Sequence, residues 1–520
     1  MWLKWLTALL LIAFFVNQGN ATFYVCAPRS FGPDQIVCVC NSTYCDTTPN
    51  NRTLIPPPGS FSQYTSSRSG LRMQLNLNAS MSNSCRGAPS GAVALRVNTS
   101  QTYQTILGFG GAFTDSNGIN ILSLSPATQS NLLASLFHPV TGNSYNLGRV
   151  PIGGTDFSLR PYTLDDIAGD YTLSQFSLAP EDLQYKIPII QQALRLAPNL
   201  LLDSAAWSAP PWMKSNGQIN GFGFLLPQFY QTYADYILQF LAAYASNGIN
   251  IWAVSTGNEP LDAYYPLSII NSMGWSPSTV ANWVVNNLGP TLANSTYNNT
   301  QILAIDDQRI VLPSAVQQMF DVPGVEDYIA GIAVHWYDDS FVPPDVLDQT
   351  HNDFPNKFIL MNEACAGSSI FDYPKVILGS WERAEQYALS MIQYFNNWSV
   401  GWMDWNFALD MVGGPNWIKN FVDALIIVNA DNDEFYKQPM FYAVKHFSRF
   451  VERGSVRIGI TNPPGDVIST TAFLTPQREV VVVVYNRNQT ETPITINEPN
   501  AGTICVTLPP QSLTTITFGQ

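Results

Sequence analysis

The chain has 520 residues, of which 46% are hydrophobic and only 12% are charged. This composition supports a large buried core and argues against an intrinsically disordered chain. The formal net charge of −14 argues against nucleic acid as a partner, because its phosphates require a positive protein surface.

The first segment that the sequence predicts is a signal peptide over residues 1–21. Lys4 precedes an apolar run of about eleven residues, Leu6–Val16, and Gly19 and Ala21 form a small-x-small cleavage site. A membrane span needs about twenty apolar residues, so an uncleaved anchor is the less favoured alternative. The sequence therefore predicts entry into the secretory pathway.

Cysteines and sequons after this segment agree with export. The dense cluster of cysteines predicts disulfide bonds, whereas a zinc site is disfavoured because no histidine is near. The cluster comprises Cys26, Cys38, Cys40 and Cys45. Eight N-x-S/T sequons predict a glycoprotein. They begin at Asn41, Asn51, Asn78, Asn98, Asn294, Asn298, Asn397 and Asn488.

The middle of the chain, residues 103–405, alternates short β-rich runs with amphipathic segments such as Phe229–Tyr244 and Trp381–Phe395. Alternation of strand and helix predicts a parallel sheet, and eight such units predict that the sheet closes into an α/β, (β/α)₈ TIM barrel. The eight runs are Ile106–Phe109, Asn146–Pro151, Asn199–Asp203, Ile251–Thr256, Ile302–Ile305, Gly331–His335, Phe358–Met361 and Val400–Asp404.

Both flanks of the barrel contain short alternating segments that predict antiparallel strands. These include Val93–Val97, Val480–Tyr485, Pro493–Ile496 and Leu513–Phe518. We expect one β-sandwich built from both ends of the chain. Its central strand should be Val480–Val484, an unbroken β-branched run. Cys85 and Cys505 lie in the two halves of this sandwich. The sequence leaves open whether they form a disulfide bond or are two free, buried thiols.

Two glutamates end predicted barrel strands. Asn258-Glu259-Pro260 follows the fourth run, and Asn362-Glu363 follows the seventh. Active sites of these barrels lie at the carboxyl ends of the strands. Glycoside hydrolysis needs two carboxyl groups, one protonated and one ionised, about 5 Å apart in retaining enzymes. An Asn-Glu-Pro motif alone also suits a surface loop, but a second strand-end glutamate favours the catalytic interpretation.

Other strand ends offer the side chains that a sugar site uses, namely aromatic faces and hydroxyl-binding polar groups. They are Arg149, Asp156, Phe157, Trp207, His335, Tyr337 and Trp405. We interpret His335 as an orienting hydrogen-bond partner, with a satisfied core histidine as the alternative. Gly108-Phe109-Gly110-Gly111 has neither phosphate-loop nor dinucleotide spacing, and no metal site or cofactor is predicted.

The sequence, including these residues, resembles the acid β-glucosylceramidase group of glycoside hydrolase family 30 over nearly the whole mature chain. Several long motifs occur in the same order. The matching stretches are Cys38–Asn41, Gly108–Ala112, Leu288–Asn294, Gly331–Tyr337, Gly413–Asn416, Asn420–Asp423 and Tyr436–Tyr442.

The resemblance implies roles for individual residues. Glu363 falls on the nucleophile and Glu259 on the general acid/base. The residues that fall on pocket positions, together with Asn258 before the acid, are Arg149, Asp156, Phe157, Trp207, His335, Tyr337, Trp405, Asn420 and Phe421. The resemblance also implies the disulfides Cys26–Cys38 and Cys40–Cys45, an immunoglobulin-like sandwich and a small three-stranded β unit.

From these observations we predict the domain boundaries. The small disulfide-bonded unit should comprise residues 22–55 and 407–438. The sandwich should comprise residues 60–102 and 455–520, and the catalytic barrel residues 103–406 and 439–454.

The activity that the resemblance implies is hydrolysis of glucosylceramide in anionic membranes, at acidic pH and with retention of configuration. It implies a lysosomal, peripherally membrane-associated enzyme with a small saposin-like activator, although secretion stays open. Alternatives are the same chemistry on a soluble β-glycoside, glucan or xylan, and an inactive carbohydrate-binding protein. The sequence departs from the family at three places. Gly257 replaces an acidic residue near Glu259, which leaves the surroundings of the acid open, and Asn362 replaces a serine before Glu363. The loop at 261–266 differs at most positions, which leaves the contacts at the mouth of the site open.

Overall fold

The computed structural model describes residues 24–48, 55–82, 91–265, 268–369, 371–461, 465 and 467–520. The predicted signal peptide, Asn51 and Cys85 lie outside these residues; Cys505, the possible partner of Cys85, is disulfide-bonded. The described strands form a closed barrel, a nine-stranded sheet and a five-stranded sheet. Within the described ranges, no helix is long and apolar enough to cross a bilayer.

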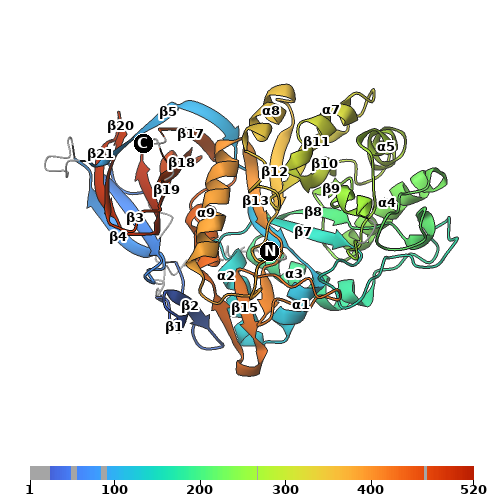
Figure 1. Ribbon diagram of the computed structural model, residues 1–520, viewed down its shortest axis with the longest axis horizontal. Coiled ribbons are helices and arrows are strands. Elements are labelled where there is room, and N and C mark those ends of the chain that lie inside the picture. The colour runs from blue at the N-terminus through green and yellow to red at the C-terminus, as the bar shows by residue number, and fades with distance from the viewer. Residues whose placement is uncertain are drawn as a thin grey trace, which may run out of the picture.

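Eight parallel strands close into the barrel in the right half of Figure 1. Each overlaps one of the eight predicted runs, which confirms the TIM-barrel prediction. In chain order the strands are β6 Gly108–Ala112, β7 Leu147–Ile152, β8 Leu201–Ala206, β9 Ala253–Ser255, β10 Gln301–Gln308, β11 Ile329–His335, β12 Phe358–Glu363 and β13 Ser399–Asp404.

Helices surround the barrel, and α4 and α9 match the two amphipathic segments named above. The helices are α1 Asp115–Leu122, α2 Pro126–Phe137, α3 Ile187–Leu196, α4 Tyr230–Ser246, α5 Pro277–Trp283, α6 Gly289–Ala293, α7 Ser314–Phe320, α8 Asp345–Asp353, α9 Trp381–Asn396 and α10 Pro439–Ser448. Helix α9 stands between the barrel and the nine-stranded sheet in Figure 1. Its Trp381 indole donates a hydrogen bond of 3.1 Å to Tyr485 of that sheet.

Glycine explains why the Gly108–Gly111 segment is a barrel strand. A Cβ at Gly110 would lie 1.8 Å from the carbonyl oxygen of Leu147 on the neighbouring strand, so only glycine permits this close approach. Apolar side chains fill the barrel interior below the site, as in other closed barrels of this size. They include Leu147, Leu303, Leu360 and Met403.

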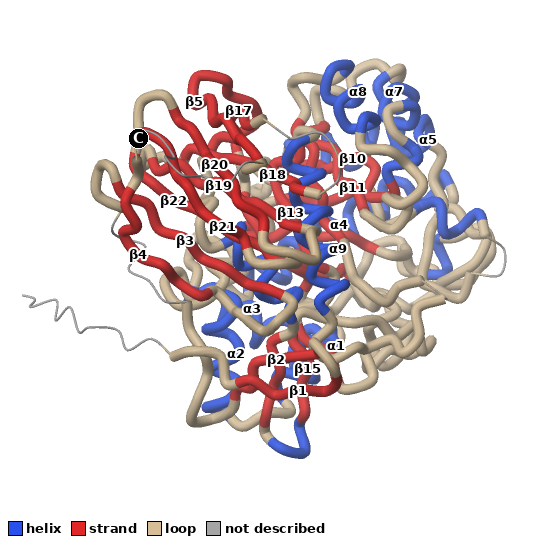
Figure 2. Tube along the Cα trace, turned by 60° about the vertical axis from the view of Figure 1, so that its left-hand side comes forward, coloured by secondary structure: helices blue, strands red, loops and turns tan. Residues whose placement is uncertain are grey.

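The nine-stranded sheet combines the two flanks and folds over on itself as the predicted sandwich, seen on the left of Figure 2. Val482 shares one apolar core with Ile494 and Ile504, although its strand is not hydrogen-bonded to either of theirs. Alternate residues Val481 and Val483 join the barrel-side core instead. The run Val480–Val484 is therefore covered on both faces, as predicted. The strands are β3 Ser60–Ser67, β4 Gln74–Ser80, β5 Val93–Thr105, β17 Val456–Ile460, β18 Ile468–Leu474, β19 Glu479–Asn486, β20 Thr492–Glu498, β21 Gly502–Leu508 and β22 Ser512–Gly519.

The small sheet joins the start of the chain to the segment after the barrel. Disulfides Cys26–Cys38 and Cys40–Cys45 are both present, which confirms the implied pairing. The sheet has five strands, two more than the implied three, because a hairpin strand and a short strand directly after the barrel extend it. The strands are β1 Pro28–Gly32, β2 Gln35–Cys40, β14 Ala408–Asp410, β15 Ile426–Asn429 and β16 Glu434–Lys437.

This small sheet also supports the loop that follows β12. Gly379 of that loop has a φ of 79°, and a Cβ there would lie 2.3 Å from the backbone nitrogen of Ile36 in β2. Its own backbone N–H donates a hydrogen bond of 2.7 Å to the Gln438 side chain, just beyond β16. The loop after β12 thus rests on both of the chain segments that form the small sheet, at the neighbouring strands β2 and β16.

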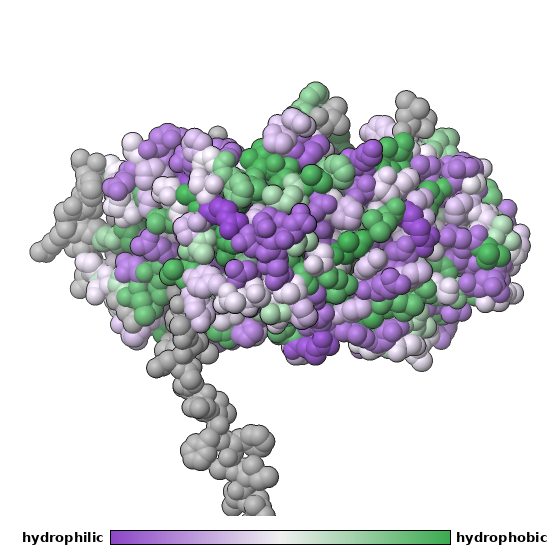
Figure 3. Space-filling model, turned by 90° about the horizontal axis from the view of Figure 1, so that it is seen from below, coloured by the Kyte–Doolittle hydropathy of each residue, from purple (hydrophilic) through white to green (hydrophobic). Residues whose placement is uncertain are grey.

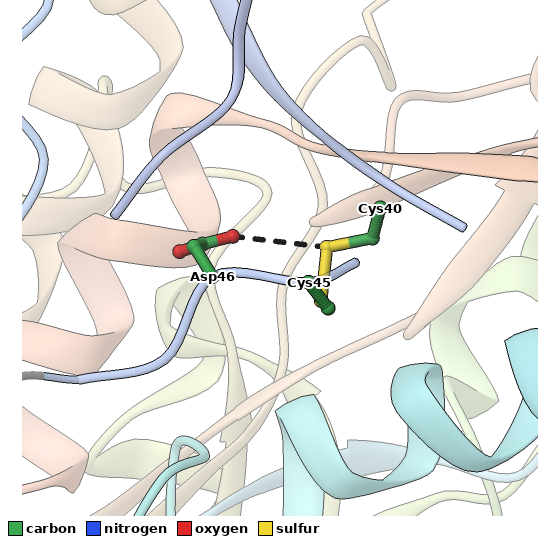
Figure 4. Close-up of side chains that lie close together, drawn as sticks. All are labelled: Cys40, Cys45 and Asp46. Carbon is green, nitrogen blue, oxygen red and sulfur yellow. Dashed lines mark hydrogen bonds between the residues drawn. A yellow bond between two sulfur atoms is a disulfide. The ribbon is translucent and has the colours of Figure 1, made fainter. Parts of the chain in front are cut away.

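A buried ion pair ties the disulfide segment to α10. Asp46 accepts hydrogen bonds from Lys437 at 3.1 Å and from Tyr442 at 2.7 Å, and it lies 3.7 Å from Sγ of Cys40 (Figure 4). Burial raises the pKa of Asp46, but the charges of Lys437 and Lys445 reverse this effect and hold the pKa below its usual value. The carboxylate is therefore ionised and depends on its cation.

Replacement of Lys437 by Met should strongly destabilise the protein, because Asp46 would remain buried without its cation. Loss of one partner of such a pair costs about 3–5 kcal/mol. We expect a lower urea midpoint for Lys437→Met than for the double variant Asp46→Asn with Lys437→Met, in which the Asp46 carboxylate is removed together with the ammonium group that it binds. Equal midpoints for the single and double variants would show that the buried charge is not the cause.

Candidate active site

The two predicted glutamates come together at the carboxyl end of the barrel. Glu363 is the last residue of β12, and Glu259 lies four residues after β9, directly before the short 3₁₀ helix η4, Pro260–Tyr264. One carboxylate oxygen of each lies within 4.8 Å of the other. Retaining glycosidases hold their two carboxyl groups about 5–5.5 Å apart, whereas inverting enzymes need room for a water between them. The separation therefore fits a double displacement.

Glu363 is held in a site that stabilises its negative charge. Arg149 of β7 donates a hydrogen bond to one oxygen, and the Tyr337 hydroxyl donates one of 2.9 Å to the other. The Arg149 guanidinium is fully buried and lies 4.9 Å from the ring centre of Trp207. Fixed donors on both oxygens also orient the carboxylate, which suits a nucleophile.

Glu259 is in a different environment, which favours its protonated form. His335 Nδ1 lies 2.8 Å from one oxygen, and the Gln308 amide donates to the same oxygen at 2.6 Å. Burial raises the pKa of Glu259 to about 8, and the nearby Asp262 carboxylate adds to this increase. A carboxyl group with a raised pKa can serve as the acid beside a carboxylate that fixed donors orient as the nucleophile.

His335 connects Glu259 to a second carboxylate. Its Nε2 lies 3.0 Å from Asp306. Burial lowers the pKa of the imidazole, but the charge of Glu363 and the hydrogen bonds with Asp306 and Glu259 raise it well above its usual value. Both ring nitrogens are occupied by carboxylates, so this histidine has no lone pair to offer a metal ion. The geometry agrees with the orienting role expected from the sequence.

Asp306 is the centre of the polar network, and the sequence analysis missed it. It accepts hydrogen bonds from Arg149 at 2.8 Å, Ser255 at 2.5 Å and Asn362 at 2.7 Å. Burial would raise its pKa, but the charge of Arg149 holds the pKa far below its usual value. Asp306 follows the fifth predicted run directly, so its place at a strand end was the signal that could have identified it.

An unusual backbone conformation directs the Asp306 side chain into the active site. Ile305 and Asp306 have φ values of 74° and 55°, and the register between β10 and β11 shifts at this point. A β-branched residue rarely adopts positive φ, so the network of contacts around Asp306 must stabilise the bulge. The bulge directs Asp306 inward, while the next residue, Asp307, accepts the backbone N–H of Leu261 at 2.9 Å.

A cavity of about 1060 Å³ opens above the two glutamates. Its inner wall carries the stacked rings of Trp207 and Trp405, 5.0 Å apart, and the Asp156 carboxyl group. Asn416 and Asn420 each donate a hydrogen bond of 3.0 Å to Asp156. Burial raises the pKa of Asp156 to about 7. Aromatic faces beside fixed hydroxyl-binding groups are typical of a pyranose site.

Most residues expected at the pocket meet there. The predicted residues that line the cavity are Asp156, Phe157, Trp207, Glu259, Tyr337, Glu363, Trp405 and Asn420. Arg149, Asn258 and His335 are buried beneath them. Arg149 and His335 contact the two carboxyl groups, and Asn258 accepts a hydrogen bond of 2.8 Å from Arg149. Phe421 lies outside the cavity lining and packs near Gly414.

Further functional candidates came from the structure alone. Gln308 and Asn416 contact predicted site residues, and the buried free thiol of Cys365 lies 3.4 Å from the Tyr337 hydroxyl. Asp262 lines the cavity beside Glu259. The second group of close cysteine and acidic side chains among the described residues, Cys40, Cys45 and Asp46, contains a disulfide and is no free ligand set.

Comparisons with known proteins agree with this geometry. Residues 106–451 match the glycosyl hydrolase family 30 TIM-barrel domain, and residues 454–516 match the family 30 β-sandwich domain. The lysosomal acid glucosylceramidase of Mus musculus is 41% identical over 514 residues, which cover 97% of this chain and 98% of the mouse protein.

Solved structures of similar proteins share the fold. The crystal structure of SrfJ from Salmonella typhimurium matches with a TM-score of 0.81 and 28% identity, over 89% of this chain and all of that one. The endo-β1,6-glucanase BT3312 matches with a TM-score of 0.78 and 26% identity, again over 89% of this chain and all of the other.

Proposed function

Because the chain belongs to glycosyl hydrolase family 30, we propose that it hydrolyses the β-glucosidic bond of glucosylceramide by a retaining double displacement. The observation that carries this proposal is the pair of glutamates whose carboxylate oxygens lie less than 5 Å apart, with Glu363 held by cationic and hydroxyl donors and Glu259 held by His335 and Gln308. The 41% identity to the mouse glucosylceramidase supports the choice of substrate.

In the first step, the Glu363 carboxylate attacks the anomeric carbon of glucose. The bond from that carbon to the ceramide oxygen breaks, and the proton on Glu259 moves to this oxygen, so ceramide leaves neutral. In the second step, Glu259 takes a proton from water, and the resulting hydroxide equivalent displaces Glu363 from the anomeric carbon. Glucose leaves with its original β configuration, and both glutamates return to their starting states.

The other parts of the site have roles in this scheme. His335 and Gln308 hold the Glu259 carboxyl group at the leaving oxygen, and Arg149 stabilises the Glu363 carboxylate before attack. Asp156, with Asn420 beside it, binds sugar hydroxyls. The rings of Trp207 and Trp405 restrict the sugar to one orientation. None of these steps requires a metal or an organic cofactor.

We also place the enzyme in the lysosomal lumen at a membrane surface. Phe341, Phe371 and Tyr373, beside the cavity, are 84%, 88% and 91% exposed. Aromatic side chains in such positions enter the interfacial region of a bilayer readily. Figure 3 shows, on one face of the molecule, small apolar patches among polar ones. The net charge of −14 opposes contact with anionic lipid, so a small saposin-like activator protein would assist.

A soluble β-glucan is the second candidate substrate, because the outer cavity is polar. Glu382, Glu385 and Gln386 of α9 and Arg487 of the sandwich line it. The structural relative BT3312 is an endo-β1,6-glucanase, which agrees with this alternative. The chemistry would be the same, and only the leaving group would differ.

Glucose release from glucosylceramide in anionic vesicles at acidic pH tests the proposal. The wild type should release glucose, and an aryl β-glucoside should be cleaved in the same buffer. Cleavage of the aryl glucoside and a β1,6-linked glucan oligomer, without cleavage of the vesicle lipid, would assign the enzyme to soluble glucans instead. Hydrolysis of none of these substrates would support a carbohydrate-binding protein without catalytic activity.

A further inference from the structure

A chain of hydrogen bonds through three side chains ends on the nucleophile. The hydroxyl oxygen of Tyr337 lies 2.9 Å from Oε1 of Glu363 and 3.4 Å from Sγ of Cys365. The carboxylate and the thiol therefore share one phenolic oxygen. All three residues line the cavity, yet no step of the double displacement uses the thiol.

The backbone fixes Cys365 at this position. The residue follows Glu363, the last residue of β12, by two positions. The carbonyl oxygens on both sides of it, those of Ala364 and Ala366, accept backbone N–H groups at 2.7 and 2.9 Å. Its side chain is only 2% exposed. The thiol is thus held beside Tyr337 by the same segment that presents the nucleophile.

The available hydrogens determine the direction of this chain. An ionised carboxylate only accepts hydrogen bonds, so the Tyr337 hydroxyl must use its single hydrogen for Glu363. The phenolic oxygen then has only lone pairs to offer Cys365, and the thiol must be the donor. Burial raises the pKa of Cys365 well above its usual value, and it does the same for Tyr337. Both groups therefore keep their hydrogens.

The contact with the thiol restricts the hydroxyl. A phenolic O–H lies in the plane of its ring in one of two orientations, and a donor that approaches its lone pairs favours the orientation toward Glu363. Hydrogen bonds in a chain also polarise and strengthen one another. Cys365 otherwise packs in an apolar cluster with Phe157 and Trp405, where a small, weakly polar thiol fits better than a strongly hydrated group.

We infer that Cys365 is a positioning residue for the nucleophile and that it acts through Tyr337. Its thiol keeps the Tyr337 hydroxyl directed at Glu363, so that the carboxylate is held in one orientation when it attacks the anomeric carbon. No bond to sulfur forms at any stage. The inference rests on the proposed role of Glu363 as nucleophile.

The rate of covalent inactivation isolates this effect. A dinitrophenyl 2-deoxy-2-fluoroglucoside has a leaving group that needs no proton, so its reaction reports the attack by Glu363 alone. For full-length Cys365→Ala, the inactivation rate constant should fall about three- to tenfold, the scale of one modest hydrogen bond. The dissociation constant of the inhibitor should not change. Cys365→Ser keeps a donor and should restore most of the rate. A wild-type rate constant in Cys365→Ala would overturn the inference.

A double-mutant cycle shows whether Cys365 acts through Tyr337. Tyr337→Phe should itself slow inactivation, because Glu363 loses a donor. In that background Cys365→Ala should have no further effect, since no hydroxyl remains to be directed. A merely structural role would instead give the same loss in both backgrounds, and that result would overturn the inference.

The S–H stretching vibration provides a test that does not depend on activity. Cys365 is the free cysteine of the described part of the chain, and the band that disappears in Cys365→Ala belongs to it. Donation to oxygen weakens the S–H bond, so this band should move to higher frequency in Tyr337→Phe. An unmoved band would show that the thiol does not donate to Tyr337, which contradicts the inference.

The site of labelling separates the two possible failures. If the fluoroglucoside labels Glu363 while the cycle is additive, the inference fails and the proposed function stands. Labelling of another side chain would overturn the assignment of the nucleophile, and the inference with it.

Discussion

Replacement of Glu363 by Gln is expected to reduce glucoside hydrolysis by a factor on the order of 10⁵, the scale on which enzymes lose activity with their nucleophile. The amide cannot attack the anomeric carbon, although it keeps the shape of the side chain. Arg149 would keep its position beside the substituted side chain, so the fold should persist. The measurement is kcat on an aryl β-glucoside, with the thermal unfolding midpoint recorded beside it.

Covalent trapping identifies the nucleophile independently of the rate. A 2-deoxy-2-fluoroglucoside should add one sugar mass to a wild-type peptide that contains Glu363, and nothing to the variant. Glu326→Gln, an exposed glutamate beyond α7, is the matched control and should retain full activity. Trapping on any other side chain would contradict the assignment of Glu363.

Replacement of Glu259 by Gln is expected to affect substrates unequally. For a substrate whose leaving group needs a proton, kcat/KM should fall by about 10²–10⁴-fold, because general acid catalysis contributes that much to the rate. A dinitrophenyl leaving group departs without a proton, so its kcat/KM should be nearly unchanged. Its kcat should fall, since water in the second step has lost its base.

Azide provides the decisive control for this variant. It needs no general base, so it should restore kcat of Glu259→Gln with the dinitrophenyl substrate and yield β-glucosyl azide. The β configuration matters because azide must attack the glucosyl-enzyme from the face that water uses. An α-glucosyl azide, or the absence of rescue, would rule out Glu259 as the acid/base of a retaining mechanism.

The architecture was accessible from sequence because its signals are local and repeated. Eight β-rich runs separated by amphipathic segments correspond one for one to the barrel strands. The β-branched run Val480–Val484 correctly indicated a strand covered on both faces, since no polar residue interrupts it. The disulfide pairing, in contrast, came only through the family resemblance. Four closely spaced cysteines permit several pairings.

The polar network of the site was less accessible. Asp306 reaches Arg149 and His335 only because Ile305 and Asp306 adopt left-handed backbone conformations, which no residue type in that segment signals. Asp262 lines the same cavity as Glu259 because a short 3₁₀ helix follows Glu259 directly. Residues fixed by strand order were thus predictable, while those fixed by a bulge or a tight turn were not.

The small sheet has a consequence for how the protein is made. Strand β2 leaves the ribosome among the first residues, but its partner β16 follows almost four hundred residues later. The loop that carries Gly379, which follows the nucleophile strand, rests on β2 and on Gln438 beyond β16. All eight barrel strands are therefore synthesised before this support exists. The nascent chain can complete its barrel early, yet its active site acquires its final shape only when β2 pairs with β16.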